Sequence, residues 1–483
     1  MEQGHFASNR PGHDAPAAAP RLGPLALDTA SSRPLHEQLY QHVREAIAEG
    51  RLAPGDRLPS RRSLAAQLNV SRGTVDAAFE RLAGEGCILG RGAAGTVVAA
   101  HLGRAPTAAR AASARAFALP DDYLWPFRGG LPALDLFPRT QWAGLATRAA
   151  RRLDASRLCY PDPRGLPELR VAIAAYLQVS RGIACDPAQV FVTAGYQAGL
   201  HLVASLVAPA GEAAWFEDPG YRFARRALAD AGVRLAMVPV DADGLDVAHA
   251  RHHHPDARLA VVTPGHQSPL GVALSPQRRL ALLEWADAAG AWVLEDDYDS
   301  EFHYLGRKPA SLKSIDRHDR VFYAGSFSKT LFPALRLGCL VVPDAWIEAA
   351  TSACELSHRG HGLLEQATLA AFMADGHYAR HLRRMRLRYA ERSAALALAL
   401  QHRFGRQVDL AAPEGGLTLL ARFPHHAPDT ELVERARAAG LAPSALSAHA
   451  TTHPAGQGLL LGFTNVKPAQ APEMADRLKR AIG

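Results

Sequence analysis

The sequence predicts a two-part α/β protein: an N-terminal winged helix-turn-helix (α+β) and, after a linker, a larger domain built on a mostly parallel sheet. Two observations lead to this prediction. Near the N-terminus, three short helical patterns are followed by a glycine-rich hairpin pattern, which is the order of elements in a winged helix-turn-helix. Farther along, β-branched runs alternate with amphipathic stretches, and this alternation indicates βαβ units with parallel strands.

Length and composition fit this plan. The chain has 483 residues, of which 48% are apolar and 21% charged, as expected of a core-forming globular protein. Its net charge of +7 permits a nucleic-acid surface without requiring one. The five cysteines are scattered and none belongs to a CxxC pair, which favours free thiols in a reducing cytosol. We expect a cytoplasmic protein, because no secretory signal and no membrane-spanning apolar run is found in the sequence.

Composition also sets the expected domain boundaries. Residues 1–30 are rich in Ala, Pro, Gly and His without periodicity, which is typical of a flexible tail. Residues 31–99 contain the helical and hairpin patterns of the N-terminal domain. Residues 100–122 are small residues interspersed with arginines and are predicted to be a linker. Residues 123–483 carry the alternating strand and helix patterns.

The N-terminal domain is predicted to contain three helices and a wing. An apolar residue recurs at every fourth position of the first helical pattern, at Leu35, Leu39, Val43 and Ile47. Ser60 is placed to cap a second helix and Ser71 a third, with a tight turn at Asn69 and Val70 between them. The stretch "CILGRGAAGTVVA" follows and is predicted to form two short strands joined by a glycine-rich turn.

Positive charge is concentrated between residues 51 and 72. This segment carries one acidic residue, Asp56, and five arginines: Arg51, Arg57, Arg61, Arg62 and Arg72. Arginines at the start of a helix, beside its free N-terminal amides, suit phosphate binding. The first turn of the third helix can also reach base edges, so Arg72 and Thr74 are the candidate base-reading residues. Solvated arginines on a small helical domain are the alternative interpretation.

The motif "LPSRRSLAAQLNVSRGTVDAAFERLAGEG" resembles the winged helix-turn-helix of GntR-type bacterial regulators. The resemblance implies that double-stranded operator DNA is contacted by Arg62, Ser71, Arg72, Gly73, Thr74, Arg91 and Gly92. This chain has Asp76 where the family often has another basic residue, and the difference bears on operator preference.

Six strand-like runs mark the large domain. They are "QVFVTAG", "EAAWFEDPG", "RLAMVPV", "RLAVVTPG", "AWVLEDDYD" and "DRVFYAGSFSK". Several of these runs are followed directly by residues that can bind a ligand or take part in catalysis: an aromatic side chain, a set of carboxylates or a lysine. The first leads through a glycine turn into a helical pattern, whose first amides could hold a phosphate.

The stretch "YAGSFSKTLFPALRLG" surrounds Lys329 with anion-binding side chains. A lysine that forms a Schiff base needs a carbonyl partner, and a phosphorylated aldehyde cofactor needs anion-binding groups. Ser326 and Ser328 offer hydroxyl groups, and Arg336 can bind phosphate oxygens bidentately. A carboxylate of "VLEDDYD" could pair with a pyridine nitrogen, and Tyr221 of "FEDPGY" could stack on a flat ring. In isolation the carboxylates could equally be a solvated loop or metal ligands, and Tyr221 a core residue.

Together these motifs resemble the fold-type-I aminotransferases, which bind pyridoxal 5′-phosphate (PLP), from about residue 122 to the end. The resemblance implies that Lys329 forms the Schiff base, that Asp296 or the adjacent Asp297 contacts the pyridine nitrogen, and that no metal is needed. It assigns the ring 3-oxygen to Tyr298 and stacking to Tyr221. Further cofactor-binding positions are Tyr196, Gln197, His266, Gln267, Ser326, Ser328 and Arg336, with Tyr160 contributed by the other subunit of a homodimer.

Both halves in one chain resemble the MocR subfamily of GntR regulators, to whose motifs "TPGHQSPLG" and "EDDYDSEF" are close. The resemblance implies a PLP-dependent transcriptional regulator that senses PLP or an amine or amino-acid effector. Two other interpretations stay open. The chain could be an active aminotransferase with an attached DNA-binding module, or a DNA-binding protein whose C-terminal half only dimerises.

The region where aminotransferases carry a carboxylate-binding arginine lacks one here. The segment "LAPSALSAHATTHPAGQGLLLGFTNV" has no arginine or lysine before Lys467, and His449 and Arg422 are weak substitutes. We therefore expect a sensor rather than an enzyme. The histidines of "RHHHPDARLA" favour a solvated loop over a metal site, because adjacent side chains point in different directions.

Overall fold

The structure is a computed structural model that describes residues 25, 27–92, 95–100, 121–304, 308–410, 415–424 and 426–483. The chain divides into two compact units, Met1–Leu119 and Pro120–Gly483. Most of the predicted tail and nearly all of the predicted linker lie outside the described residues. Among the described residues, no helix combines the length and apolar character that crossing a bilayer requires.

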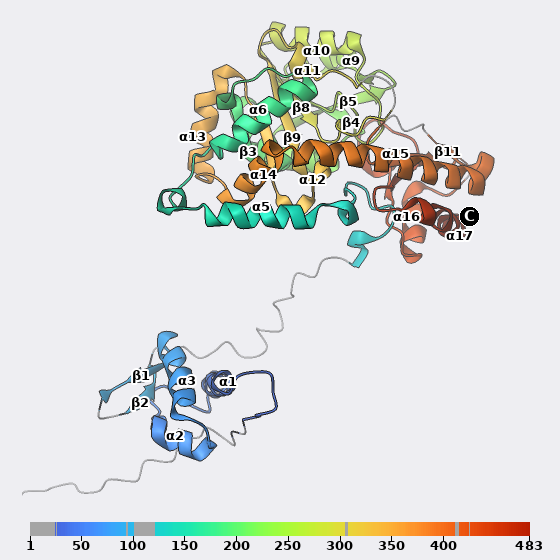
Figure 1. Ribbon diagram of the computed structural model, residues 1–483. Coiled ribbons are helices and arrows are strands. Elements are labelled where there is room, and N and C mark those ends of the chain that lie inside the picture. The colour runs from blue at the N-terminus through green and yellow to red at the C-terminus, as the bar shows by residue number, and fades with distance from the viewer. Residues whose placement is uncertain are drawn as a thin grey trace, which may run out of the picture. The chain divides into compact units, whose positions relative to one another are not determined.

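The N-terminal unit is a winged helix-turn-helix, as the sequence predicts (Figure 1). Its elements are α1 (Leu35–Ala48), α2 (Arg61–Leu68), α3 (Arg72–Gly84), β1 (Ile88–Gly90) and β2 (Thr96–Val98). The strands β1 and β2 pair antiparallel and form the wing.

Both predicted helix caps are confirmed. The Ser60 hydroxyl accepts a hydrogen bond from the Ser63 amide and the Ser71 hydroxyl one from the Thr74 amide, each at 3.1 Å. Asn69 ends α2 in the left-handed conformation, with φ of 52°. Apolar side chains of all three helices and of the wing pack into one core: Leu39, Val43, Leu64, Val75, Phe79, Leu82, Ile88 and Val98. Capping and core together fix the angle between α2 and α3, the helices of the helix-turn-helix.

The large unit is built on an eight-stranded sheet of order β3-β10-β9-β8-β7-β4-β5-β6. Its strands are β3 (Val190–Thr193), β4 (Ala213–Asp218), β5 (Arg234–Asp241), β6 (Gly244–Leu245), β7 (Leu259–Val262), β8 (Trp292–Asp297), β9 (Val321–Ser326) and β10 (Gly338–Val341). The pairs from β9 through β8, β7 and β4 to β5 are parallel. β10 runs antiparallel to both β3 and β9, and β6 antiparallel to β5. The mostly parallel sheet is confirmed, and all six strand-like runs are strands.

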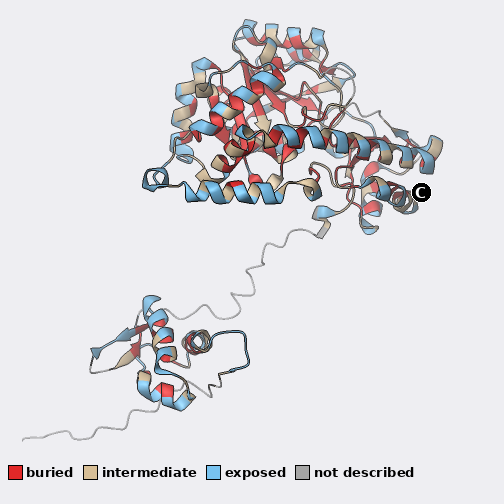
Figure 2. Ribbon diagram, in the orientation of Figure 1, coloured by how far each residue is buried: buried red, intermediate tan, exposed pale blue. Residues whose placement is uncertain are grey.

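Helices cover both faces of this sheet (Figures 1 and 2). Successive side chains of a strand point to opposite faces, so Phe322 and Ala324 of β9 pack in one core cluster and Val321 and Tyr323 in two others. The covering helices are α5 (Arg139–Arg151), α6 (Pro167–Arg181), α7 (Tyr196–Val207), α8 (Arg222–Asp230), α9 (Val247–His253), α10 (Pro276–Ala288), α11 (Leu312–Ile315), α13 (Ile347–Ser357) and α14 (Leu363–Ala374). The sheet is therefore the buried middle layer of this unit.

A second, antiparallel sheet follows the long helix α15 (His377–Phe404). Its order is β11-β12-β14-β13, with β11 (Asp409–Leu410), β12 (Thr418–Arg422), β13 (Ser444–Ala445) and β14 (Leu459–Gly462). Helices α16 (Asp429–Ala438) and α17 (Ala471–Ile482) pack on each other, and α17 also packs on α15 (Figure 1). This second sheet was not among the sequence predictions.

Candidate cofactor site and DNA-binding surface

The candidate cofactor residues follow the carboxyl ends of neighbouring strands. Tyr221 follows β4, His266 follows β7, Tyr298 follows β8 and Lys329 follows β9. In open α/β sheets this edge is where ligands bind, because parallel strands bring the loops at their carboxyl ends together.

Lys329 lies in the short helix α12 (Phe327–Thr330), directly after β9. The hydroxyl of Ser326 accepts a hydrogen bond from the amide of Ser328 at 3.2 Å and so orders the turn. The Lys329 Nζ donates to the main-chain carbonyl of Gly130 at 2.6 Å. Burial lowers the pKa of Lys329, although the carboxylates of Asp299 and Asp296 act in the opposite direction. A lowered pKa makes the neutral amine, which is the nucleophilic form, easier to populate.

The adjacent carboxylates Asp296 and Asp297 lie on opposite faces of β8. Asp297 forms an ion pair with Arg181 Nε at 2.6 Å and accepts a hydrogen bond from the Tyr323 hydroxyl at 2.7 Å. Burial alone would raise the pKa of Asp297, but the Arg181 guanidinium lowers it overall. Asp297 is therefore an ionised group that already has its cation.

Asp296 has no cationic partner of this kind among the described residues. Its side chain faces α7, where the Tyr196 hydroxyl is buried and makes no hydrogen bond of normal geometry within the described chain. Burial raises the pKa of Asp296 well above its ordinary value, Tyr196 opposes this shift, and the nearby carboxylates of Asp297 and Glu217 add to it. A cationic ligand atom beside Asp296 would therefore be strongly favoured.

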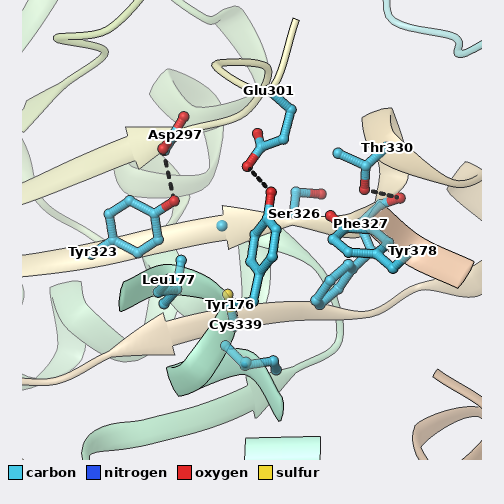
Figure 3. A pocket seen from close by; sticks show the side chains of 12 residues that line it. Tyr176, Leu177, Asp297, Glu301, Tyr323, Ser326, Phe327, Thr330, Cys339 and Tyr378 are labelled. Atoms are coloured by element: carbon cyan, nitrogen blue, oxygen red, sulfur yellow. Dashed lines mark hydrogen bonds between the residues drawn. The ribbon is translucent and has the colours of Figure 1, made fainter. Parts of the chain in front are cut away.

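A small cavity lies beside Asp297 (Figure 3). Its volume is about 20 Å³, and its walls include Tyr176, Glu301, Cys339 and Tyr378. The Tyr176 hydroxyl donates to Glu301 across the cavity at 2.7 Å. A space of this size holds about one water molecule, so the cavity is too small for a cofactor.

An anion-binding corner is formed where β3 meets α7. Gly195, with φ of +86°, turns the chain into α7, whose first residues are Tyr196 and Gln197. The Arg336 Nη2 donates to the Ala194 carbonyl at 3.0 Å, which holds the exposed guanidinium over this turn. A Cβ atom on Gly195 would lie 3.4 Å from that guanidinium. The free amides of a helix N-terminus and a guanidinium beside them suit a phosphate group.

Aromatic residues continue from this corner toward Asp296. The rings of Tyr196 and Tyr221 lie 6.3 Å apart between centroids and are tilted by 56°. Burial raises the pKa of both hydroxyl groups, and the carboxylate of Asp296 raises both further. The two tyrosines and Asp296 therefore belong to one local cluster.

The loop after β7 places His266 and Gln267 differently. His266 Nδ1 lies 3.0 Å from the Tyr298 hydroxyl and 3.1 Å from the Asp299 carboxylate. The amide nitrogen of Gln267 instead donates to Glu217 and to the carbonyls of Pro219 and Ser268, and its oxygen accepts from the Leu270 amide. Gln267 is buried and engaged at both ends, so it orders the loop rather than presenting a free donor.

Tyr160 is not joined to the Lys329 group within the described part of the chain. Its side chain is 81% exposed, and the Arg359 guanidinium lies 5.6 Å from its ring centroid. A large aromatic side chain this exposed is available to another subunit.

The two weak candidates for carboxylate binding have other partners. Arg422 Nη1 donates to the carbonyls of Ala455 and Gln457 at 3.2 and 3.4 Å. His449 Nδ1 lies 3.3 Å from the Gly220 carbonyl, and burial lowers the pKa of its ring. Neither side chain is presented as a free cation.

The histidines of "RHHHPDARLA" do not all lie in a loop as predicted, because His252 and His253 belong to α9. The ring of His253 stacks on that of His249, with centroids 4.1 Å apart. Within the described ranges, no group of three or more His, Cys, Asp or Glu residues has the geometry to hold a metal ion.

The predicted DNA-contacting residues of the N-terminal unit lie at the surface. Arg62, Ser71, Arg72, Gly73, Arg91 and Gly92 are exposed, and Thr74 is half-buried. The Thr74 hydroxyl lies 2.8 Å from that of Ser71, so it takes part in the helix cap. Asp76 lies 3.2 Å from Arg61 and 3.8 Å from Arg72, in ion pairs that cross the start of α3. An acidic residue thus partly neutralises the candidate reading surface.

Several residues of the site had escaped the sequence analysis. Gly130 at Lys329, Arg181 at Asp297, and Thr263, which donates to Glu217 at 3.0 and 2.5 Å, all come from segments distant in sequence from their partners. The pair of glycines in "RGGLP" was a possible signal for Gly130, whereas a buried arginine inside a helix gives none.

Two protein families match the two units. The family described as "Bacterial regulatory proteins, gntR family" matches residues 35–98, and "Aminotransferase class I and II" matches residues 140–450. Among solved structures, a kynurenine aminotransferase of Pyrococcus horikoshii is 25% identical, with a TM-score of 0.67 over 74% of this chain and 89% of that one. An α-aminoadipate aminotransferase of Thermus thermophilus is 26% identical, with the same TM-score over 74% and 91%. The fold and site thus define a DNA-binding regulator with an aminotransferase-like unit.

Relatives that match over nearly the whole chain specify the family more closely. A probable rhizopine catabolism regulatory protein, MocR, of Rhizobium meliloti is 36% identical over 95% of this chain and 96% of its own length. The transcriptional regulator TauR of Rhodobacter capsulatus is 35% identical over 93% and 96%. The pyridoxine biosynthesis regulator PdxR of Corynebacterium glutamicum is 34% identical over 91% and 94%. The chain belongs to the MocR subfamily of GntR-type transcriptional regulators.

Proposed function

We propose that this regulator binds PLP at Lys329 and that the state of this site sets its affinity for operator DNA. The observation that carries the proposal is the pairing of Lys329, a half-buried lysine of lowered pKa, with Asp296, a buried carboxylate for which no ion pair is found among the described residues. A pyridine ring that carries an aldehyde and a protonated nitrogen would supply a carbonyl partner for the lysine and a cation for Asp296. When bound, PLP supplies the electron-withdrawing ring that stabilises negative charge next to an attached amine.

The neighbouring residues fit the rest of the cofactor. The phosphate would be bound at the start of α7 by Tyr196, Gln197, Ser326, Ser328 and Arg336. Gly195 supports this role, because its φ of +86° turns the chain into α7 directly beside the Arg336 guanidinium. Tyr221 would stack on the ring. Tyr298, whose hydroxyl lies beside His266, would donate to the ring 3-oxygen.

The mechanism assigns a separate task to each side chain. Lys329 would hold the aldehyde carbon through its Nζ, and Asp296 would keep the ring nitrogen protonated. Asp297 cannot share this task, because its charge is already neutralised by Arg181. The Tyr298 hydroxyl, the Tyr221 ring and the Arg336 guanidinium would orient the bound group at three points: the 3-oxygen, the ring face and the phosphate.

We propose a sensor rather than an enzyme. Arg422 and His449 are engaged by main-chain carbonyls, so neither offers the bidentate cation that would orient an α-carboxylate. Poor orientation alone can slow a reaction about a hundredfold. PLP itself or an amine without a carboxylate is therefore the better effector. The relatives are named as regulatory proteins, which supports a sensor over an enzyme.

A homodimer completes the proposal. The exposed Tyr160 would reach the partner subunit's cofactor, and two winged helices would bind two operator half-sites. The arginines at the start of α2 and α3 would position the unit on phosphates, while Arg72 reads a base edge.

The test is a spectroscopic and DNA-binding titration of the full-length protein with PLP. We expect a visible absorbance band that Lys329→Ala abolishes, together with a change in operator affinity that the variant does not show. A band that persists in the variant would place the cofactor on another lysine. Repeated turnover of amino acids with operator binding indifferent to PLP would favour the active aminotransferase, the alternative supported by the aminotransferase fold.

A further inference from the structure

We propose that the main-chain carbonyl of Gly130 is a positioning group for Lys329, and that cofactor binding at this lysine releases the segment around it. We call residues 125–131 the arm. The arm follows closely on the predicted linker, so its release would reach the chain that leads to the DNA-binding unit. The inference rests on the proposed function only in naming PLP as the ligand that withdraws Lys329.

The contact between the arm and Lys329 depends on glycine. The Nζ donates to the Gly130 carbonyl at 2.6 Å. Gly130 has φ of +77°, and a Cβ atom at this position would lie 2.8 Å from the same Nζ. A side chain would therefore collide with the amine and also strain the backbone, so glycine is the residue that permits this approach.

The other face of the arm is held by the C-terminal sheet region. The amide of Gly462 donates to the Phe127 carbonyl at 2.9 Å, and the amide of Ala442 donates to the Pro126 carbonyl at 2.8 Å. Phe127 is 1% exposed and pairs with Gly462 as an isolated antiparallel bridge. The arm thus contacts the region of the second sheet through Pro126 and Phe127 and contacts Lys329 through Gly130.

The arm also stores backbone strain. Phe127 has φ of +69°, a conformation that a bulky residue rarely adopts. Such a residue keeps its conformation only while its surroundings impose it. Phe127 and Gly130 are three residues apart, so loss of the contact at one weakens the constraint on the other.

The arm is connected to the residues that follow the predicted linker. Arg128 donates to the carboxylate of Asp122 at 3.1 Å, and Arg437 of α16 lies 3.4 Å from the same carboxylate. Lys329 is therefore linked to Asp122 by two hydrogen bonds and by the main chain from Gly130 back to Arg128. Such a contiguous set can carry coupling when one of its members has two states.

Lys329 has two such states. A free lysine ammonium has three N–H donors, one of which is given to Gly130 here. When a lysine amine condenses with an aldehyde, a carbon–nitrogen double bond forms and one water leaves with the aldehyde oxygen and two hydrogens. The nitrogen then keeps at most one hydrogen, and its position is set by the new partner. The Gly130 carbonyl loses its donor, and the arm loses one of its anchors.

Hydrogen exchange measured by mass spectrometry on the full-length protein tests this inference. The probes are the amides of Ala442 and Gly462, because their acceptors are the Pro126 and Phe127 carbonyls of the arm. PLP is expected to raise exchange at both amides several-fold. Lys329→Met, whose unbranched side chain is one heavy atom shorter and has no donor, is expected to raise exchange without PLP and to abolish the response to PLP.

A pair of glycine variants provides a matched comparison. Gly130→Ala places a methyl group against the Lys329 Nζ, whereas a Cβ on Gly129 meets nothing closer than the Thr418 hydroxyl at 3.9 Å. Gly130→Ala is expected to raise exchange at Ala442 and Gly462 and to weaken the PLP absorbance response. Gly129→Ala is expected to leave both unchanged, which excludes a general effect of added volume.

The outcomes separate this inference from the proposed function. If the PLP band forms but neither PLP nor Lys329→Met changes exchange at the two amides, the role of Gly130 is wrong and the proposed function stands. If no band forms, the proposed function fails. The comparison of Lys329→Met and Gly130→Ala with the unchanged protein, which needs no cofactor, then still decides whether the lysine holds the arm.

Discussion

The two units place their candidate functional side chains in opposite environments. In the N-terminal unit Arg62 and Arg72 stand in solvent, whereas in the large unit Asp296 and Asp297 are buried and Lys329 is half-buried. Exposed charges act through fields that salt screens, while buried charges are controlled by desolvation and by their immediate partners. The same substitution of a charged residue should therefore have graded effects in one unit and large, local effects in the other.

The largest expected effect is in the buried ion pair of the large unit. Asp297→Asn leaves the Arg181 guanidinium, whose side chain is 1% exposed, without its counter-charge. Breaking such a pair costs about 3–5 kcal/mol. We expect the unfolding free energy of the large unit, measured by urea denaturation and circular dichroism, to fall by this amount. The unfolding free energy of the winged helix-turn-helix should stay unchanged.

Asp230 supplies the matched control, because it pairs with Arg226 at 2.7 Å on the surface of α8. Asp230→Asn is expected to cost less than about 1 kcal/mol. Equal losses for the two variants would remove the contrast between buried and exposed charge.

Glu217 makes the stability of the large unit depend on pH. Burial raises the pKa of Glu217 from 4.5 to about 7, so between these values the folded state binds more protons than the unfolded state. Stability linked to this group therefore falls as pH rises through the window, by up to about 3 kcal/mol.

We expect Glu217→Gln to flatten the pH dependence of the unfolding free energy between pH 4.5 and 7. Glu284→Gln, at an exposed glutamate of α10, should leave the slope as it is. A slope that is the same in all three proteins would mean that Glu217 stays ionised in the folded state.

An intermediate effect is expected at the reading surface. Arg72→Ala should cost about 1–3 kcal/mol of operator binding and relax the preference at one base position. Arg62→Ala should weaken all sequences alike and flatten the salt dependence. Binding isotherms on operator and mutated operator, at two salt concentrations, distinguish the two roles. Uniform weakening by both variants would assign Arg72 to the phosphates as well.

The smallest effect is expected at Asp76. Its ion pairs with Arg61 and Arg72 are partly exposed, so Asp76→Asn changes the energy of each by less than about 1 kcal/mol. The substitution frees two guanidinium groups for DNA, and we expect tighter binding to operator and to random DNA together. A gain confined to the operator would show that Asp76 instead helps to select its sequence.

The fold was predictable where local patterns decide it. Ser60 and Ser71 occupy cap positions that the hydrogen bonds confirm, and six apolar runs became the strands of one sheet. β6, β10 and the second sheet were missed. β6, β11 and β13 are two residues long and β10 is four residues long. Short strands are stabilised by their partners, which a sequence does not place.

The candidate site, like the fold, was predictable only in part. Tyr221 and Lys329 stood out because each follows a predicted strand, whereas Tyr298 and the roles of all three came from the resemblance to aminotransferases. The distinction between Asp296 and Asp297 could not be made, since it depends on Arg181 in α6, more than a hundred positions earlier in the chain. The hydrogen bond from the Gln267 side chain to Glu217 could not be predicted from the sequence either.

The strand order of the large sheet also has a consequence for synthesis on the ribosome. β3 pairs with β10, so its hydrogen-bonding partner emerges only after residues 338–341 have been made, and the second sheet needs β14 near the C-terminus. The winged helix-turn-helix, in contrast, has all its partners by residue 98. At usual elongation rates the interval is on the order of tens of seconds. The winged helix-turn-helix can therefore fold on the nascent chain well before the large unit has all of its strands.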